Sequence, residues 1–245
     1  VPLMLSRFRI ADLADRSGRS LSGGEAQRAS LARAFVLNPR IVFLDEPFAS
    51  LDPPTREALL QDLAGAIAET RTTVVFATHH QDEALRLADR MAVMRGGAVV
   101  QIGRCEDVMN SPRDEFVASF VGMETVLWGT VLEAAQGTVT LSVAGRQVAA
   151  VGEAAPGEEL LVGVRPENVT LSAAPHTEAT SARNVFPATV VGIVPKGFFY
   201  KVALDCGFPL AAYVTGRSVE MLGIRQGARV AASFKATAVH VIRKK

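Results

Sequence analysis

The sequence predicts an α/β domain with a parallel sheet, followed by an all-β domain made of two related repeats. Up to about residue 122, apolar runs that resemble buried strands alternate with segments of helical periodicity. From residue 125 onward, short β-rich runs recur between Gly and Pro residues with almost no helical periodicity. This second half also contains one order of strands twice. We therefore expect two domains, at residues 1–122 and 123–245.

The first domain is expected to hold helices around two buried strands. The strands are the apolar runs IVFLD and TTVVFATH, and because neither alternates with polar residues, both faces of their parallel sheet should be covered. A hairpin should follow, turning at Gly96-Gly97, with Met91 and Met94 in the core. The expected helices lie at about 23–37, where Asn38-Pro39 ends the pattern, after Pro53-Pro54, and at 81–89.

The second domain repeats itself at about 125–172 and 184–243. Each copy has a strand with Thr-Val after Gly or Ala, a turn, a second strand and a glycine-led strand that ends in V-x-V or V-H-V. Two copies are too few for a solenoid, which needs three or more units. We expect two small OB-like barrels that pack as a pair.

Composition limits the function classes. The chain has 245 residues, 49% of them hydrophobic, and a net charge of +1, so nothing suggests nucleic-acid binding. Two cysteines, Cys105 and Cys206, make no disulfide framework and favour a reducing compartment. No uncharged apolar stretch reaches the roughly 18–20 residues that cross a bilayer. Because the chain opens on Val1 in what resembles mid-domain sequence, we expect a fragment.

The stretch LSGGEAQR, residues 21–28, precedes a helix-prone run. Ser22 and Glu25 form an S-x-x-E capping box, which accounts for both of them. Capping does not explain Gly23 and Gly24, which cost stability in a first turn. Bare backbone N–H groups at the positive end of a helix bind anions, so the pair of glycines indicates a phosphate contact.

The run IVFLDEP ends a strand with two adjacent carboxylates. Side chains alternate across a strand, so Asp45 and Glu46 point in different directions and serve different purposes. At the carboxyl end of a parallel strand, one carboxylate can hold hydrated Mg²⁺ while the other faces an attacking water. A solvated strand end is the alternative if the D-E-P run is taken alone.

The order LSGGEAQR, IVFLDEP, ASLD and a second strand ending in Thr78-His79 resembles the ATP-binding cassette (ABC) ATPases. The resemblance implies that ATP and Mg²⁺ are cofactors, that Asp45 serves Mg²⁺, that Glu46 is the general base or orients the water, and that His79 senses the γ-phosphate. It also implies a homodimer, in which one subunit contacts the nucleotide of the other. The residues implied to contact nucleotide in trans are Ser22, Gly23 and Gly24 of the signature motif, with Gln27, and Asp52 of the Ser50-Leu51-Asp52 loop.

One family motif is absent from this sequence. The phosphate-cradling loop reads G-x-x-x-x-G-K-[ST], yet none of the five lysines precedes Ser or Thr. The chain therefore carries half of a nucleotide site, and we expect it to be inactive alone. The lysines are Lys196, Lys201, Lys235, Lys244 and Lys245.

The second repeat resembles the molybdate-binding (Mop or TOBE) modules appended to some importer ATPases. The resemblance rests on T-S-A-R-N at 180–184 and on the run 214–236, while the V-R-P-E run at 164–167 is similar to importer ATPases of this type. A tetrahedral dianion needs hydroxyls, N–H groups and a cation. The candidates are Ser181, Arg183, Thr215, Ser218 and Lys235, with turn formation and surface charge as the alternative reading.

The resemblances imply the ATP-hydrolysing subunit of an ABC importer for tungstate or molybdate, which energises a separate membrane permease. It would lie peripherally on the cytoplasmic face of the inner membrane. The alternatives are a soluble oxyanion-binding protein with an inactive cassette remnant, or an importer ATPase for sulfate, iron, a sugar or a polyamine. An ABC protein that acts on DNA or ribosomes is disfavoured by the neutral charge. His80, His176 and His240 are interpreted as structural or solvated residues.

Overall fold

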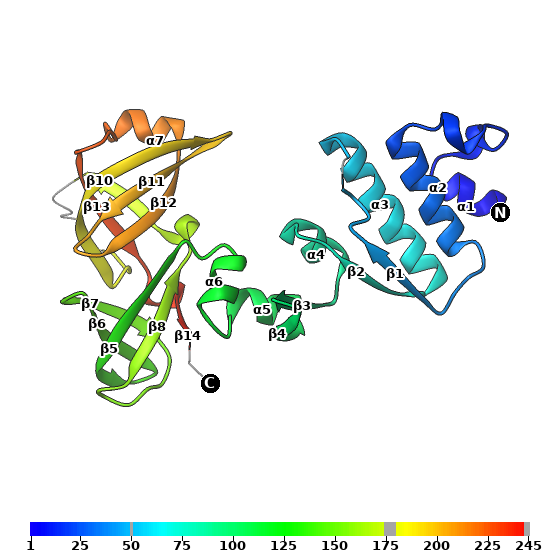
Figure 1. The fold of residues 1–245 in the computed structure, drawn as a ribbon. Coiled ribbons are helices and arrows are strands. Elements are labelled where there is room, and N and C mark those ends of the chain that lie inside the picture. The colour runs from blue at the N-terminus through cyan, green and yellow to red at the C-terminus, as the bar shows by residue number, and fades with distance from the viewer. Residues whose placement is uncertain (50, 174–179, 243–245) are drawn as a thin grey trace. The chain divides into compact units, whose positions relative to one another are not determined.

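The computed structural model describes residues 1–49, 51–173 and 180–242, so the predictions for Ser50 and His176 lie outside the described residues. The chain forms two compact units, Val1–Asp89 and Arg90–Lys245, whose helices and strands Figure 1 labels. The predicted division near residue 122, which rests on the change from alternating helices and strands to β-rich runs, stays a prediction.

The first unit joins four α-helices to a pair of parallel strands. Strands β1 (Ile41–Asp45) and β2 (Thr73–Ala77) pair in parallel, as the sequence predicts, and Asp45 lies opposite Ala77. Phe8, Phe35 and Leu59 are among the fully buried side chains that hold the helices together. The helices are α1 (Pro2–Arg7), α2 (Gly23–Phe35), α3 (Pro53–Thr70) and α4 (Gln81–Leu87), and two short 3-10 turns lie at Ala11–Leu13 and Gly18–Ser20.

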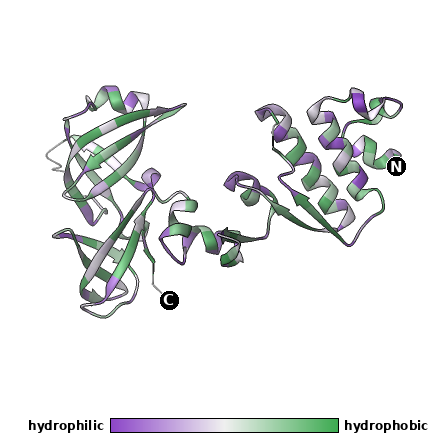
Figure 2. Ribbon diagram, in the orientation of Figure 1, coloured by the Kyte–Doolittle hydropathy of each residue, from purple (hydrophilic) through white to green (hydrophobic). Residues whose placement is uncertain are grey.

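The prediction that both faces of the β1–β2 pair are covered is wrong for the described residues. Val42 is buried, and Leu44 and Val74 pack against the helical core. Phe43 on the other face is 72% exposed, and Val75 is 49% exposed. Figure 2 colours both strands as hydrophobic over most of their length. The apolar runs are typical of a sheet that is covered on both faces. In the described residues, these helices cover one of the two faces.

The second unit begins with the predicted hairpin. Strands β3 (Arg90–Arg95) and β4 (Ala98–Arg104) are joined by Gly96 and Gly97, whose φ angles are +57° and +82°. Two helices that the sequence analysis did not identify follow, α5 (Cys105–Asn110) and α6 (Glu115–Phe120). Met91 packs against their core, but Met94 is 59% exposed, so its predicted core position is wrong: it sits at the solvent-facing end of β3, beside the turn.

Two five-stranded antiparallel sheets form the rest of this unit, as Figure 1 shows. One sheet has the order β14-β8-β5-β6-β7 and the other β12-β11-β10-β13-β9. The first repeat contributes β5 (Thr125–Ala135), β6 (Thr138–Val143), β7 (Arg146–Val151), β8 (Glu159–Val164) and β9 (Thr170–Ala173). The second contributes β10 (Asn184–Lys196), β11 (Phe199–Asp205), β12 (Pro209–Thr215), β13 (Arg229–Phe234) and β14 (Val239–Ile242).

The two repeats exchange their last strands. Strand β9 of the first repeat pairs with β13 of the second, and β14 of the second pairs with β8 of the first. A short 3-10 turn, Pro166–Asn168 or Ala236–Ala238, precedes each exchanged strand. One hydrophobic cluster runs through both sheets, so the predicted pair of barrels shares a core. The short helix α7 (Gly216–Met221) is a local exception to the all-β prediction.

Candidate functional site

The N-terminus of α2 is closed by the predicted capping box. Ser22 Oγ accepts a hydrogen bond from the Glu25 amide at 3.3 Å, and Glu25 Oε2 accepts one from the Ser22 amide at 2.7 Å. The bond from the Ser22 amide is the largest influence on the Glu25 carboxyl and lowers its pKa. This end of the helix is therefore fixed by its own residues.

The two glycines differ in their surroundings. A Cβ atom on Gly23 would meet no atom within 4 Å, whereas one on Gly24 would lie 3.2 Å from Thr55 Cγ2 of α3. Ser22 and Gly23 are exposed. The packing of α3 thus gives a structural reason for Gly24. Gly23 has no such reason, and its backbone faces open space.

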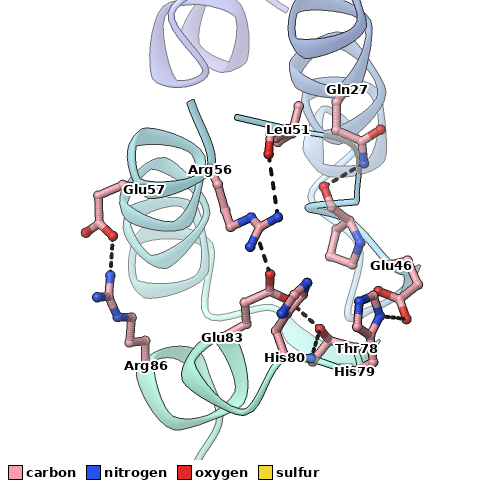
Figure 3. A network of polar contacts seen from close by, with 11 residues as sticks. Gln27, Glu46, Leu51, Arg56, Glu57, Thr78, His79, His80, Glu83 and Arg86 are labelled. Atoms are coloured by element: carbon pink, nitrogen blue, oxygen red, sulfur yellow. Dashed lines mark hydrogen bonds and ion pairs between the residues drawn. The ribbon is translucent and has the colours of Figure 1, made fainter. Parts of the chain in front are cut away.

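The end of β1 brings a carboxylate to a histidine. Glu46 follows the strand with φ +44°, and its amide donates to Ala77 O at 3.0 Å. Its Oε1 lies 2.8 Å from His79 Nδ1, as Figure 3 shows. A non-glycine residue at positive φ costs free energy and is common at functional sites. The structure therefore joins two predicted catalytic residues from different strands.

Asp45 precedes Glu46 in the chain, and Gln27 bonds the residue that follows Glu46. Asp45 is the exposed last residue of β1. Gln27 of α2 donates through Nε2 to the carbonyl oxygen of Pro47, at 2.8 Å. The helix that carries the signature motif is thus tied to the residue that follows Glu46.

Asp52 has a local role in the structure. It is the N-cap of α3, where its Oδ2 accepts from the Thr55 amide at 3.2 Å. The bond with Thr55 lowers the pKa of the Asp52 carboxyl, which is fully exposed. An ionised side chain at this helix end is favoured by the helix dipole.

The five candidate oxyanion residues do not form one site in the structure. Ser181 and Lys235 line an open groove of about 550 Å³ together with Thr180 and Ser233. Thr215 instead caps α7, accepting from the Ser218 amide at 3.3 Å. Ser218 shares that cap, and Arg183 is exposed and does not line the groove.

Sequence reasoning missed Asn184, the last residue of the T-S-A-R-N run. Its side chain is buried and bonds both backbone groups of Ala149 in β7, donating to the carbonyl at 2.9 Å and accepting from the amide at 2.7 Å. Asn184 therefore fastens β10 of the second repeat to β7 of the first. The signal lies in the T-S-A-R-N run itself, of which Asn184 is the buried residue.

Arg165, within the V-R-P-E run, was also missed. Its guanidinium donates to Val121 O and Met109 O, both at 2.7 Å, at the ends of α6 and α5. His240 Nδ1 lies 2.8 Å from Asn110 O, which confirms the structural reading of this histidine. Both side chains hold the helical segment 105–122 against the first sheet.

Some features are absent from the described residues. These ranges contain no group of three or more His, Cys, Asp or Glu side chains placed to hold a metal ion. None of their helices has the length and apolar character needed to span a membrane. Cys105 and Cys206 are both buried and form no disulfide with each other.

Two family models match the chain. Residues 2–49 match the ABC transporter family and residues 180–241 match the TOBE domain. The chain is 40% identical over 239 residues to the molybdate/tungstate import ATP-binding protein WtpC of Pyrococcus horikoshii, covering 95% of this chain and 65% of that protein. It is 41% identical over 191 residues to the Fe(3+) ions import ATP-binding protein FbpC of Streptomyces avermitilis, covering 78% and 54%.

A third relative is named for a different solute. The spermidine/putrescine import ATP-binding protein PotA of Ruegeria pomeroyi is 33% identical over 243 residues, which cover 98% of this chain and 64% of that protein. The chain thus spans about two thirds or less of the length of these relatives. By fold and motifs it is an ATP-binding cassette protein. It belongs to the ABC transporter ATP-binding proteins that carry a TOBE domain.

Proposed function

We propose that this chain is the C-terminal portion of the ATP-hydrolysing subunit of an ABC importer. The observation that carries the proposal is the 2.8 Å contact between Glu46 and His79 at the end of β1, directly after Asp45. A carboxylate held by an imidazole is suited to orient an attacking water and to accept its proton. Residues from two neighbouring strand ends thereby supply the hydrolytic side of a nucleotide site.

Asp45 is the residue that would hold Mg²⁺. Its carboxylate is exposed and follows a β-strand, and Mg²⁺ is typically bound by one or two carboxylates together with substrate phosphates and water. When bound, the ion would neutralise charge on the phosphates. Glu46 and His79 would act on the water and the γ-phosphate.

The exposed turn of α2 would serve a second copy of the protein. Ser22 and Gly23 are exposed, and Gly23 leaves open space around its backbone, whereas the Ser22 amide is already bonded to Glu25 Oε2. Phosphate binds well at such helix N-termini. We propose that Ser22, Gly23, Gly24, Gln27 and Asp52 face the nucleotide of the partner in a homodimer. The phosphate-binding lysine, which this sequence lacks, would come from another segment of the protein.

The transported solute is proposed to be an oxyanion such as molybdate or tungstate. The name of the relative from Pyrococcus horikoshii and the TOBE match support this choice. The groove with Ser181 and Lys235 offers a hydroxyl and a cation, the groups that bind such dianions. A separate membrane permease and a peripheral position on the cytoplasmic face of the membrane follow from this role.

The test is Glu46→Gln in the full-length gene product. We expect ATP hydrolysis to fall by about 100-fold or more while ATP binding persists, because the amide cannot accept the proton of the water. Glu57→Gln, which changes an exposed carboxylate on α3, is the matched control and should leave hydrolysis unchanged. Normal turnover by Glu46→Gln would contradict the assigned role. A wild-type protein without hydrolysis would favour the oxyanion-binding protein with an inactive cassette.

A further inference from the structure

The side chain of Thr78 stabilises the turn that carries His79. Thr78 Oγ1 accepts a hydrogen bond from the His80 amide at 3.0 Å, so the threonine side chain closes the turn around His79. The same hydroxyl donates to Glu83 Oε2. The position of His79, and with it the contact to Glu46, therefore depends on a group that lies on α4.

Glu83 is an unusual residue for that position. It lies in the first turn of α4, yet its side chain is only 3% exposed. Its second oxygen, Oε1, faces Arg56 Nε of α3 at 3.9 Å. Among the described residues, these two facing atoms are the buried side-chain N and O atoms that lack a hydrogen-bond partner. Buried groups of this kind are normally bonded, so a pair held just beyond bonding distance needs an explanation.

Arg56 reaches a second segment. Its Nη2 donates to the carbonyl oxygen of Leu51 at 3.5 Å, just before Asp52 caps α3. One guanidinium thus contacts the backbone beside Asp52 and the carboxylate that holds Thr78. Figure 3 shows the line of contacts from Leu51 through Arg56 and Glu83 to Thr78, with His79 and Glu46 beyond.

We propose that Glu83 and Arg56 are positioning residues that couple the Leu51–Asp52 segment to the His79 turn. A small movement of the Leu51 backbone changes the approach of Arg56 Nε to Glu83 Oε1 and is passed through Thr78 to His79. Such coupling requires an element with two arrangements, and the proposal assigns them to this pair: Arg56 Nε and Glu83 Oε1, 3.9 Å apart in the structure, would be bonded in one arrangement and separated in the other. The inference rests on the proposed function, in which Asp52 faces the partner's nucleotide and His79 faces the chain's own.

A second ion pair between the same helices provides the matched control. Arg86 of α4 pairs with Glu57 of α3, and both side chains are about half exposed. The pair joins α3 to α4 but makes no contact with Thr78 or Leu51 that the structure shows (Figure 3). Glu57→Gln therefore removes a link between these helices without touching the proposed line of contacts.

The first experiment needs no nucleotide. Hydrogen–deuterium exchange is followed in the chain at peptides that contain Leu51 and Asp52, and at peptides that contain His79 and His80. We expect Glu83→Gln, which loses the charge that faces Arg56, to speed exchange by about threefold or more in both segments. Arg56→Gln should give the same pattern from the opposite end, and Arg56→Lys, which keeps the charge, should restore part of the protection. Glu57→Gln should alter neither segment.

Two further results separate coupling from local stabilisation. The double variant Arg56→Gln with Glu83→Gln should exchange no faster than either single variant, because both break one line of contacts. Faster exchange that stays on α4 in Glu83→Gln, with the Leu51 peptide unchanged, would overturn the proposal. If Glu83→Gln fails to fold, the Arg56 variants decide, and an unchanged His79 peptide in Arg56→Gln would overturn it too.

An assay of the full-length ATPase gives the mechanistic readout. Glu83→Gln should lower kcat by about 10- to 100-fold with little change in the KM for ATP, since misplacing a catalytic group affects the chemical step. Equal changes in Glu57→Gln would count against the proposal. Absence of hydrolysis in the wild-type protein would refute the proposed function alone, because the exchange experiment decides the coupling separately.

Discussion

Glu46 and His79 meet because of the register between β1 and β2. Asp45 lies opposite Ala77 in the parallel pair, so the residues that follow each strand, Glu46 on one and Thr78 and His79 on the other, emerge at the same edge. The Glu46 amide continues the pairing by donating to Ala77 O at 3.0 Å. The sheet itself thus sets the 2.8 Å contact between the two side chains, which are 33 positions apart in the chain.

Gly23→Ala separates the folding role of the α2 N-terminus from its proposed phosphate contact. Because a Cβ on Gly23 meets no atom within 4 Å, and Ala is the better helix former, the variant should be as stable as the wild type or more stable, by up to about 1 kcal/mol. Hydrolysis by the full-length dimer should nevertheless fall, since the new methyl group lies where the partner's phosphate would approach. Thermal melting and ATPase rates measure the two effects. Full activity in Gly23→Ala would contradict the proposed contact in trans.

The N-terminus of α2 and the β3–β4 hairpin were readable from the sequence because each rests on local rules. The capping box of Ser22 and Glu25 is a pattern four residues long, and the hairpin at Gly96-Gly97 needs only a turn that accepts positive φ. The order of the motifs predicted Glu46 and His79 as catalytic residues. No rule of sequence spacing predicts the distance between their side chains.

Long-range relationships could not be read in this way. The exchange of β9 and β14 depends on pairing between strands that lie 57–63 residues apart for β9 and β13 and 75–81 residues apart for β14 and β8, for which the sequence holds no local signal. The line from Leu51 through Arg56 to Glu83 likewise depends on how α3 and α4 pack. Charged residues on a helix are usually solvated, so a glutamate 3% exposed was not anticipated.

Asn184→Ala should destabilise the unit of two sheets. The substitution leaves the amide and the carbonyl of Ala149 without their partner in a buried place, at a cost of about 2–4 kcal/mol. Asn184→Asp should also lower the free energy of unfolding, because its carboxylate is buried and brings a negative charge to the Ala149 carbonyl oxygen. Chemical denaturation of the chain measures the free energies. Asn168→Ala, on an exposed asparagine, is the control, and an equal loss there would contradict the role given to Asn184.

His240 should make the stability of the second unit, Arg90–Lys245, depend on pH. Burial lowers the pKa of His240 below its ordinary value of 6.5 in the folded chain, and the nearby charge of Arg165 acts in the same direction. Below pH 6.5 the unfolded chain then binds more protons than the folded chain, so the free energy of unfolding decreases as the pH falls through this range. His240→Gln keeps a neutral donor for Asn110 O and does not titrate. Its melting temperature should decline less than that of the wild type between pH 7.5 and pH 5, and parallel declines would refute the assignment.

Molybdate or tungstate should raise the melting temperature of the chain more than sulfate does. A ligand that binds only the folded state at about 100 times its Kd adds about 2.7 kcal/mol to stability. Lys235→Ala should reduce this shift, because Lys235 is the cation of the groove that also contains Ser181. Thr215→Ala is the informative comparison: Thr215 caps α7 and does not line the groove, so its loss should lower the baseline melting temperature and leave the shift intact. If Thr215→Ala abolishes the shift and Lys235→Ala does not, the anion binds away from the groove. Equal shifts with sulfate would argue against the proposed choice of solute.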